Sequence, residues 1–504
     1  MIKIDIKNLV EPQLEFGQGY KSPFVKDSLL QGCGPYASNL YRGIKTINLG
    51  LVCLDENELQ IRKWIDSLHT NLIADENNYK RFKEFSGVEK TLKCRFELNT
   101  NSIRKLNKDY FGKLGPIPTP VMFDFILNNY LENIESLLSD QKLDCIIVYF
   151  PEEVASLRMA NNRLSYEEKI VLERLRQEDE SNQLDLFESS ENQTKIRKYF
   201  EELLPRAEEL LFRSFYRALK AKSMLLPNSV PLQIIRDHSF INDKSNQSSS
   251  TIAWNTSLGI YYKAGNIPWR LADIPSDTCY VGISFHYMKR RSGEMMYASL
   301  AQAFSSNGEG FALKGENIPQ EQVYHKSPYL NKEQARNLIE RVISFYNQKV
   351  GVNPSRIVIH KTSRYHADEM EGFESAILEQ VSNSELIWFN PSGFRLLRQG
   401  MYPPDRGLLC RFPDKQTYLF TTGYVKKWDV YPGPHIPSPL EIGSNKAFDI
   451  EKTATEILGL TKMNWNNAEA LDRHPITLTF ARRVGTIITE LNDETPNPSY
   501  RFYM

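Results

Sequence analysis

Apolar residues along the chain follow two patterns, short continuous runs and longer stretches with a spacing of three or four residues. Leu143 to Phe150 (LDCIIVYF) is a short, β-branched run that ends at Pro151, which predicts a buried strand. The same reasoning predicts strands at Pro231 to Ile235, Thr278 to Tyr287 and Arg356 to His360, and helices at Glu201 to Met224 and Glu333 to Gln348. Alternation of strands and helices in both halves predicts an α/β fold.

Three polar segments interrupt this alternation. Residues 176–195 are rich in charge, residues 242–250 (NDKSNQSSS) offer nothing to bury, and residues 431–439 (YPGPHIPSP) repeat proline, which lacks a backbone donor. We expect linkers or surface loops at all three. Because 504 residues exceed a single hydrophobic core, we place a division near residue 270, between units 1–270 and 271–504.

Composition narrows the class of protein without naming a function. Hydrophobic residues make up 41% and charged residues 25%, which is typical of a globular chain. The net charge of zero decides nothing about nucleic acid, because cations can gather in one channel while acids cover the rest. Six cysteines without a C-x-x-C pair predict buried thiols. The sequence has neither an apolar run of about 18 residues nor a signal-peptide core, so we expect a cytoplasmic protein.

Four residues in the first half have side chains suited to holding the end of a nucleic-acid strand. Tyr216 and Lys220 lie four apart, on one side of the predicted helix, followed by Gln233 and Lys263. A tyrosine ring can stack on a terminal base, while lysines and an amide can hold a terminal phosphate. The Tyr-x-x-x-Lys spacing alone is equally compatible with a solvated helix face.

The surrounding motifs give these residues a family context. FYRALK, PLQIIRD and LGIYYKAGNIPW, in this order, resemble the Rossmann-like MID domain of Argonautes. The resemblance implies that Tyr216, Lys220, Gln233 and Lys263 grip the 5′-phosphate of a guide strand. It also implies a Mg²⁺ ion that bridges guide phosphates to a C-terminal carboxylate, here that of Met504.

The second half resembles the PIWI domain of the same family, which has an RNase-H-like core. Nuclease-active members carry acids where VGISF has Ser284, where RIVIHKTS has Thr362, and where PITLTFARRV has Arg482. Two-metal cleavage needs carboxylates to hold its cations, and neutral hydroxyls or a guanidinium do not replace them. We therefore expect a PIWI domain that binds but does not cut. Neither Glu309 nor Glu316 can be matched to the remaining glutamate of active members.

Other charged residues have simpler interpretations. Asp368, Glu369 and Glu371 are interpreted as the solvated first turn of a helix, where acids favour the helix dipole. His360 and His366 lack partners at metal-ligand spacing and are interpreted as structural. Three basic groups are candidate contacts along a guide–target duplex: Lys289-Arg290-Arg291, Lys426-Lys427 and Arg482-Arg483. Asp273 and Asp277, with Asp368 and Glu369, remain an alternative acidic site if the strand positions are misplaced.

Further motifs resemble short prokaryotic Argonautes in particular: EPQLEFGQG, GCGPY, IVIHKTS, YPGPHIPSPLEIG and LTKMNWNN. Such proteins use guide RNA to recognise complementary single-stranded DNA and activate a partner, an effector–APAZ protein with a TIR, sirtuin-like or nuclease domain, in defence against plasmids or phage. We favour a TIR-APAZ partner. Two alternatives remain open, a guide-dependent endonuclease and a stand-alone nucleic-acid-binding module. An effector–APAZ protein in the adjacent reading frame would separate the last from the complex.

Overall fold

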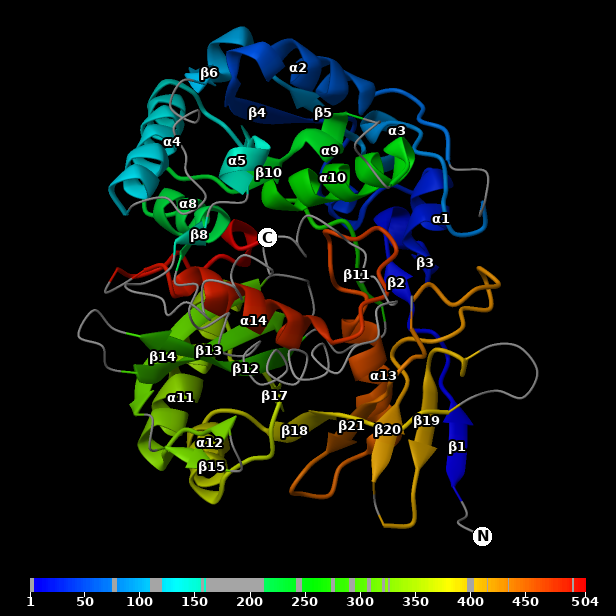
Figure 1. Ribbon diagram of the computed structural model, residues 1–504. Helices are drawn as coiled ribbons and strands as arrows, with labels where there is room; N and C mark the ends of the chain where they lie inside the picture. Colours follow the sequence, from blue (N-terminus) through cyan, green and yellow to red (C-terminus); the bar gives the residue numbers. More distant parts are fainter. Residues whose placement is uncertain are drawn as a thin grey trace, which may run out of the picture.

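The computed structural model describes residues 4–504 except 75–78, 109–119, 156–157, 160–212, 242–246, 273–276, 290–294, 306–309, 320–321, 325–326, 397–402, 415, 434 and 492–493. Two sheets organise the described chain, one in each half, with helices packed around both (Figure 1). No helix in the described ranges has the length and apolar character needed to cross a membrane.

The first sheet is parallel throughout and has the order β10-β7-β4-β5, with β6 also paired to β4. Its strands are β4 (Lys45–Leu54), β5 (Cys94–Glu97), β6 (Ile103–Leu106), β7 (Cys145–Tyr149) and β10 (Leu232–Ile235). The helices of this half are α1 (Val25–Leu30), α2 (Glu58–Ser67), α3 (Val88–Leu92), α4 (Pro120–Asp140), α5 (Glu152–Ala155), α8 (Phe215–Ser223), α9 (Asp237–Phe240) and α10 (Ser249–Lys263). Parallel strands joined through helices form the Rossmann-like unit that the sequence predicts.

The second sheet has the order β1-β19-β20-β21-β18-β17-β12-β13-β14. Its strands are β1 (Asp5–Asn8), β12 (Thr278–Lys289), β13 (Met295–Ser305), β14 (Gly310–Pro319), β17 (Arg356–Lys361), β18 (Asn383–Pro391), β19 (Leu408–Arg411), β20 (Thr417–Leu419) and β21 (Leu440–Gly443). The helices are α11 (Lys332–Val350), α12 (Ala367–Leu378), α13 (Ile450–Leu460) and α14 (Ile476–Ile488). β12, β13 and β14 are antiparallel, whereas β12, β17 and β18 are parallel. This arrangement confirms the expected RNase-H-like core and the α/β class.

Alternate residues of β12 face different layers, as the two-residue period of a strand requires. Cys279, Val281 and Ile283 belong to a core shared with α11 and α12, whereas Tyr280 belongs to the larger core that includes α14. Gly282 faces α14 too, because a Cβ there would lie 2.0 Å from the Thr477 carbonyl oxygen. Helices therefore cover both faces of the central strands. α11 and α12 pack on one face, and α14 packs on the other face, against Gly282.

The two halves are joined by backbone pairing as well as by side chains. β1 pairs with β19 of the second sheet, and β11 (Arg270–Leu271) pairs with β2 (Leu14–Glu15), which also pairs with β3 (Lys21–Ser22). β1 therefore lies across the division expected near residue 270. Two smaller pairs complete the described strands: β8 (Arg158–Met159) with β9 (Arg213–Ser214), and β15 (Val323–Tyr324) with β16 (Ser327–Pro328).

A partly buried carboxylate, that of Glu11, fixes the N-terminal segment against the second half. Glu11 accepts hydrogen bonds from Lys462 Nζ at 2.6 Å and from Arg406 Nε at 3.1 Å. Burial by itself would raise the pKa of Glu11, but the two cations outweigh burial and hold this pKa at about 2. The carboxylate therefore stays ionised.

Two expected elements differ from the structure. The predicted helix Glu201 to Met224 is not continuous, because β9 occupies Arg213–Ser214 and α8 begins only at Phe215; residues 201–212 lie outside the described chain. The predicted loop 242–250 ends earlier than expected, since Ser248 accepts a hydrogen bond from Thr251 N and starts α10 at Ser249. Residues 176–195 lie outside the described chain, while the described part of 431–439 forms no helix or strand, as predicted.

The interpretation of Glu369 as a solvated residue is wrong. Its side chain is fully buried and accepts hydrogen bonds from Lys361 Nζ at 2.5 and 2.7 Å and from Leu330 N at 3.0 Å. Burial lowers the pKa of Lys361, and the charge of Glu369 opposes this change. Asp368 and Glu371 are exposed as expected, and His360 is a buried structural histidine whose Nδ1 is 2.8 Å from Thr477 Oγ1. All six cysteines are buried and free, as predicted.

Removal of one partner from the Lys361–Glu369 pair should destabilise the second half strongly. Glu369→Ala leaves a buried ammonium group unpaired, which we expect to lower the free energy of unfolding by about 3–5 kcal/mol. Glu371→Ala on the same helix is the matched control, because its partner Lys332 is exposed and such pairs contribute about 0–1 kcal/mol. Urea denaturation measures both, and an equal loss in the two variants would contradict the expectation.

Candidate functional site

α8 places Tyr216 and Lys220 beside the first sheet. The helix is anchored by Phe215, whose ring packs against those of Phe123, Tyr130 and Phe150 at centroid distances of 5.3 to 5.7 Å. Lys220 is 2% exposed, and its Nζ lies 4.7 Å from the centre of the Tyr216 ring. A buried ammonium group thus lies against an aromatic face, where the ring quadrupole attracts it.

Gln233 and Lys263 meet on the neighbouring elements. Gln233 lies on β10, and Lys263 is the last residue of α10. Lys263 Nζ donates a hydrogen bond of 2.7 Å to Gln233 Oε1, and Lys263 is only 4% exposed. The structure therefore brings these two predicted site residues into direct contact.

The C-terminal segment completes this cluster. Lys220 Nζ donates a hydrogen bond to the Met504 carbonyl oxygen, and Met504 and Tyr503 are buried. Tyr500 stacks on Phe480 of α14 with ring centroids 4.0 Å apart, which holds the segment between α14 and the first unit (Figure 1). We call Tyr216, Lys220, Gln233, Lys263 and Met504 the lysine pocket.

The electrostatics of the lysine pocket favour an anion. Burial, and next the charge of Arg483, lower the pKa of Lys220 well below its usual value. Burial, and next the charge of Lys220, lower the pKa of Lys263 to about 7. Within the described ranges, the largest effects on the pKa values of the two lysines come from burial, from other cations, from Cys145 and from Tyr216. A phosphate in the pocket would relieve this excess of positive charge.

Arg483 is the residue of this region whose place the sequence did not reveal. It was expected on a duplex surface with Arg482, yet it acts electrostatically on both lysines and on Tyr500. Arg482, the residue directly before Arg483, is exposed instead. Phe480 and Arg483 are three residues apart on α14, so they lie on the same face of the helix. Because Phe480 stacks on Tyr500 of the C-terminal segment, this face points toward the lysine pocket.

The parallel pairing of β12 with β17 ends just before Ser284 and Thr362. Gly282 pairs with His360 and Ile283 with Lys361, and Ser284 and Thr362 follow directly after this last pair. Ser284 is buried, and it lies on the α14 face of β12 because it is two residues after Gly282.

The alternative acids do not assemble in the described chain. Asp277 comes directly before β12, seven residues before Ser284, Asp368 is exposed, and Glu369 accepts hydrogen bonds from Lys361. Asp273 and Glu309 lie outside the described chain. Among the described residues, no group of three or more His, Cys, Asp or Glu side chains could hold a metal ion.

The remaining candidate contacts have mixed surroundings. Lys426 and Lys427 are exposed, and Lys426 Nζ is 3.2 Å from Asp405. Arg290 and Arg291 lie outside the described chain, as does the side chain of Lys289.

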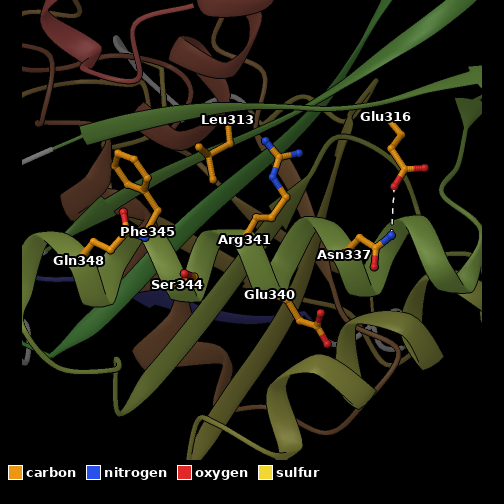
Figure 2. Close-up of a pocket in the computed structure, with 8 residues that line it drawn as sticks. All are labelled: Leu313, Glu316, Asn337, Glu340, Arg341, Ser344, Phe345 and Gln348. Atoms are coloured by element: carbon orange, nitrogen blue, oxygen red, sulfur yellow. Dashed lines mark hydrogen bonds between the residues drawn. The ribbon is translucent and has the colours of Figure 1, made fainter. Parts of the chain in front are cut away.

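A groove of about 640 Å³ lies away from the lysine pocket, between β14 and α11 (Figure 2). Its wall includes Glu316, which accepts a hydrogen bond of 3.1 Å from Asn337 Nδ2 on the α11 side of the sheet. Glu316 therefore faces away from α14, Ser284 and Thr362, and the groove adds nothing to the candidate site.

Comparison with known proteins supports the fold. No protein-family model matches the sequence, and no curated protein matches it. Among solved structures, Clostridium butyricum Argonaute matches with a TM-score of 0.59 and 15% identity, covering 98% of this chain and 54% of that protein. Aquifex aeolicus Argonaute matches with a TM-score of 0.56 and 15% identity over 98% and 54% of the two chains. Drosophila Piwi matches with a TM-score of 0.58 and 14% identity over 99% and 56%.

This chain thus spans about half the length of each of these structures. Their matches extend over both of its sheets, since almost the whole chain is covered. The protein therefore has an Argonaute-like fold.

Proposed function

We propose that this protein binds the 5′-phosphate of a guide strand and recognises nucleic acid complementary to that guide, in the cytoplasm. The observation that carries the proposal is the lysine pocket, in which Lys220 and Lys263 are buried beside each other and near Arg483. Each is also in the last turn of its helix, where the helix dipole favours a cation. A terminal phosphate would accept charge-assisted hydrogen bonds from both lysines while Tyr216 stacks on the first base.

The structural neighbours are compatible with more than one guide chemistry. The Clostridium butyricum protein was solved with a guide DNA and a 19-mer target DNA, and an A. aeolicus structure contains externally bound siRNA. For this chain we propose guide RNA and single-stranded target DNA, on the resemblance of its motifs to short prokaryotic Argonautes. Base pairing would carry the sequence information, and the protein would contact the duplex through its backbone.

A divalent cation is compatible with the pocket if Met504 supplies a carboxylate. The Met504 carbonyl oxygen lies inside the pocket, where Lys220 donates a hydrogen bond to it. The described residues provide no cluster of His, Cys, Asp or Glu for a metal, so the other ligands would be phosphate oxygens of the guide. We propose Mg²⁺ at Met504, where it would neutralise part of the phosphate charge.

We propose further that the protein does not cleave its target. Ser284 and Thr362 directly follow the last paired positions of β12 and β17. The resemblance to PIWI domains puts them where metal-dependent cleavage needs carboxylates. Two hydroxyl groups can donate hydrogen bonds to a phosphodiester but do not hold two metal ions. Recognition would then be passed to an effector–APAZ partner, which we expect to be a TIR-APAZ protein acting against plasmids or phage.

Loss of both lysines should abolish recognition of the guide's 5′ end. Lys220→Ala with Lys263→Ala removes two charge-assisted contacts, so the preference for a 5′-phosphorylated over a 5′-hydroxyl RNA should fall by about 100-fold or more. Lys222→Ala is the matched control, because this lysine is on the same helix and pairs with Glu494. Filter binding at physiological salt measures the preference. Retention of this preference by the double variant would overturn the assignment.

The affinity for a 5′-phosphorylated guide should depend on pH through Lys263. The pKa of this lysine is about 7 in the free protein, and bound phosphate raises this pKa. The contribution of Lys263 to the affinity is therefore fully present below about pH 7 and weakens above it. The fall approaches about tenfold per pH unit between pH 7 and 9. The guide phosphate itself sets the acidic limit, since its second pKa is about 6.

Lys263→Arg provides the test of this cause. The guanidinium stays protonated across the whole range, so the variant should bind with a flatter pH profile. Fluorescence anisotropy with labelled RNA measures both profiles, and a 5′-hydroxyl RNA serves as the reference. An identical slope for the wild-type protein and the arginine variant would assign the pH dependence to another group.

Cleavage assays separate the proposal from an active endonuclease. Protein loaded with guide RNA and mixed with complementary DNA and Mg²⁺ or Mn²⁺ should release no shortened DNA, because Ser284 and Thr362 supply no charge to the metals. A labelled target resolved on a denaturing gel detects the products. Guide-dependent fragments from the purified wild-type protein would refute the loss of activity.

A further inference from the structure

A second polar pocket lies beside the lysine pocket and has no role in the function proposed above. It has a volume of about 460 Å³, and four of its nine lining residues carry carboxamides: Gln247, Asn255, Asn466 and Asn467. Carboxamides pair a donor with an acceptor and match the edges of nucleobases, adenine above all. We call this cavity the amide pocket.

The amide pocket touches the lysine pocket at Gly259. A Cβ at Gly259 would lie 3.2 Å from Asn466 Oδ1 and 3.5 Å from Gln233 Oε1, so both oxygens flank the same bare point of α10. Gln233 accepts the hydrogen bond from Lys263. A strand that reaches the lysine pocket therefore has the amide pocket next to it.

An ion pair and an aromatic ring form the other wall. Arg81 donates two hydrogen bonds to Glu469, at 2.8 and 2.9 Å, and its guanidinium lies 4.7 Å from the centre of the Phe82 ring. Asn255 accepts a hydrogen bond of 2.9 Å from Ala468 N, which fixes the segment after Asn466 against α10. The pocket is therefore built by three segments that are held to one another.

Cations continue from this wall across the surface. A small cavity shares Arg81 and Glu469 with the amide pocket and is also lined by Lys26, Lys80 and Lys83. Burial, opposed by Glu469, lowers the pKa of Lys26 to about 8. The cavity is closed by Trp428, which follows the exposed Lys426 and Lys427 in a short hairpin.

Acids balance only part of this charge. Asp27 pairs with Lys83 at 3.4 Å, and Asp429 pairs with Lys80 at 3.5 Å, while Glu469 serves both Arg81 and Lys26. Lys427 has no ion pair in the part of the chain that the structure describes. Lys26 is buried, whereas the other four cations are at least partly exposed, and we call Lys80, Arg81, Lys83 and Lys427 the basic rim.

We propose that the amide pocket and the basic rim bind the unpaired 3′ flank of the target strand, beyond the nucleotide opposite the guide's first nucleotide. This inference rests on the proposed function. With the guide's 5′-phosphate in the lysine pocket, antiparallel pairing directs the target's 3′ continuation past the same point. The guide strand ends at its 5′-phosphate, so the strand that continues beyond the lysine pocket is the target strand. Amides then contact bases, and lysines contact phosphates.

The test compares three DNA targets with the same guide-complementary sequence, each including the nucleotide opposite guide position 1. One ends there, one extends six nucleotides at its 3′ end, and one extends six nucleotides at its 5′ end. On guide-loaded protein, the 3′ extension should strengthen binding by about 3- to 10-fold at 0.1 M salt and steepen the salt dependence by about 0.7 per phosphate contacted. The 5′ extension controls for length.

Variants assign the effect to the basic rim. Lys80→Ala with Lys83→Ala should reduce binding of the 3′-extended target to that of the flush target, with flush binding unchanged. Lys332→Ala with Lys446→Ala is the matched control, because it removes two lysines that pair with carboxylates of α12, and it should keep the 3′ effect.

Two outcomes overturn the inference, and they are distinguishable. Equal gains in affinity from the 3′ and 5′ extensions, or a 3′ gain that survives in the rim variant, would exclude binding of the 3′ flank by the basic rim. Guide-dependent binding of the flush target would be intact in either case. Absence of guide-dependent binding to the flush target would overturn the proposed function, and the inference with it.

Discussion

The burial of two like charges in one pocket is the constraint that explains much of the arrangement around α8 and α10. An isolated buried ion is destabilising by several kcal/mol, and a second one nearby adds to that. Here the dipoles of two helix ends, the Tyr216 ring, the Gln233 amide oxygen and the Met504 oxygen each offset part of it. These groups come from four separate stretches of chain, so the site exists only when both halves and the C-terminal segment are assembled.

The same dependence separates what the sequence could reveal from what it could not. Tyr216, Lys220, Gln233 and Lys263 were identifiable because their motifs are local. The apolar pattern predicted the helix that carries Tyr216 and Lys220 and the strand that carries Gln233, but it did not predict α10, which carries Lys263. Arg483 was not placed in the pocket, because its position depends on how α14 docks against a segment that begins 17 residues later at Tyr500. The positions of Ser284 and Thr362 after the last paired residues of β12 and β17 likewise depend on a strand register that one sequence does not specify.

Glu369 shows why a correct rule can give a wrong result. Acids in the first turn of a helix are favourable whether that turn is in water or in the core, so the pattern in the sequence is the same. What decides between them is Lys361, eight residues earlier at the end of β17, whose side chain points toward α12. The error in the helix from Glu201 has another origin, since an apolar period continued through residues where the backbone forms β9 instead.

The pairing of β1 with β19 has a consequence for synthesis on the ribosome. Asp5 pairs with Arg411, so the 405 residues from 6 to 410 are translated between the two partners. At roughly 5–20 residues per second, the first strand waits on the order of 20–80 seconds for its neighbour. During that interval the backbone donors and acceptors of β1 have no neighbouring strand of this chain to pair with. The strand, DIKN, is short and partly charged, which limits its premature association with other nascent chains.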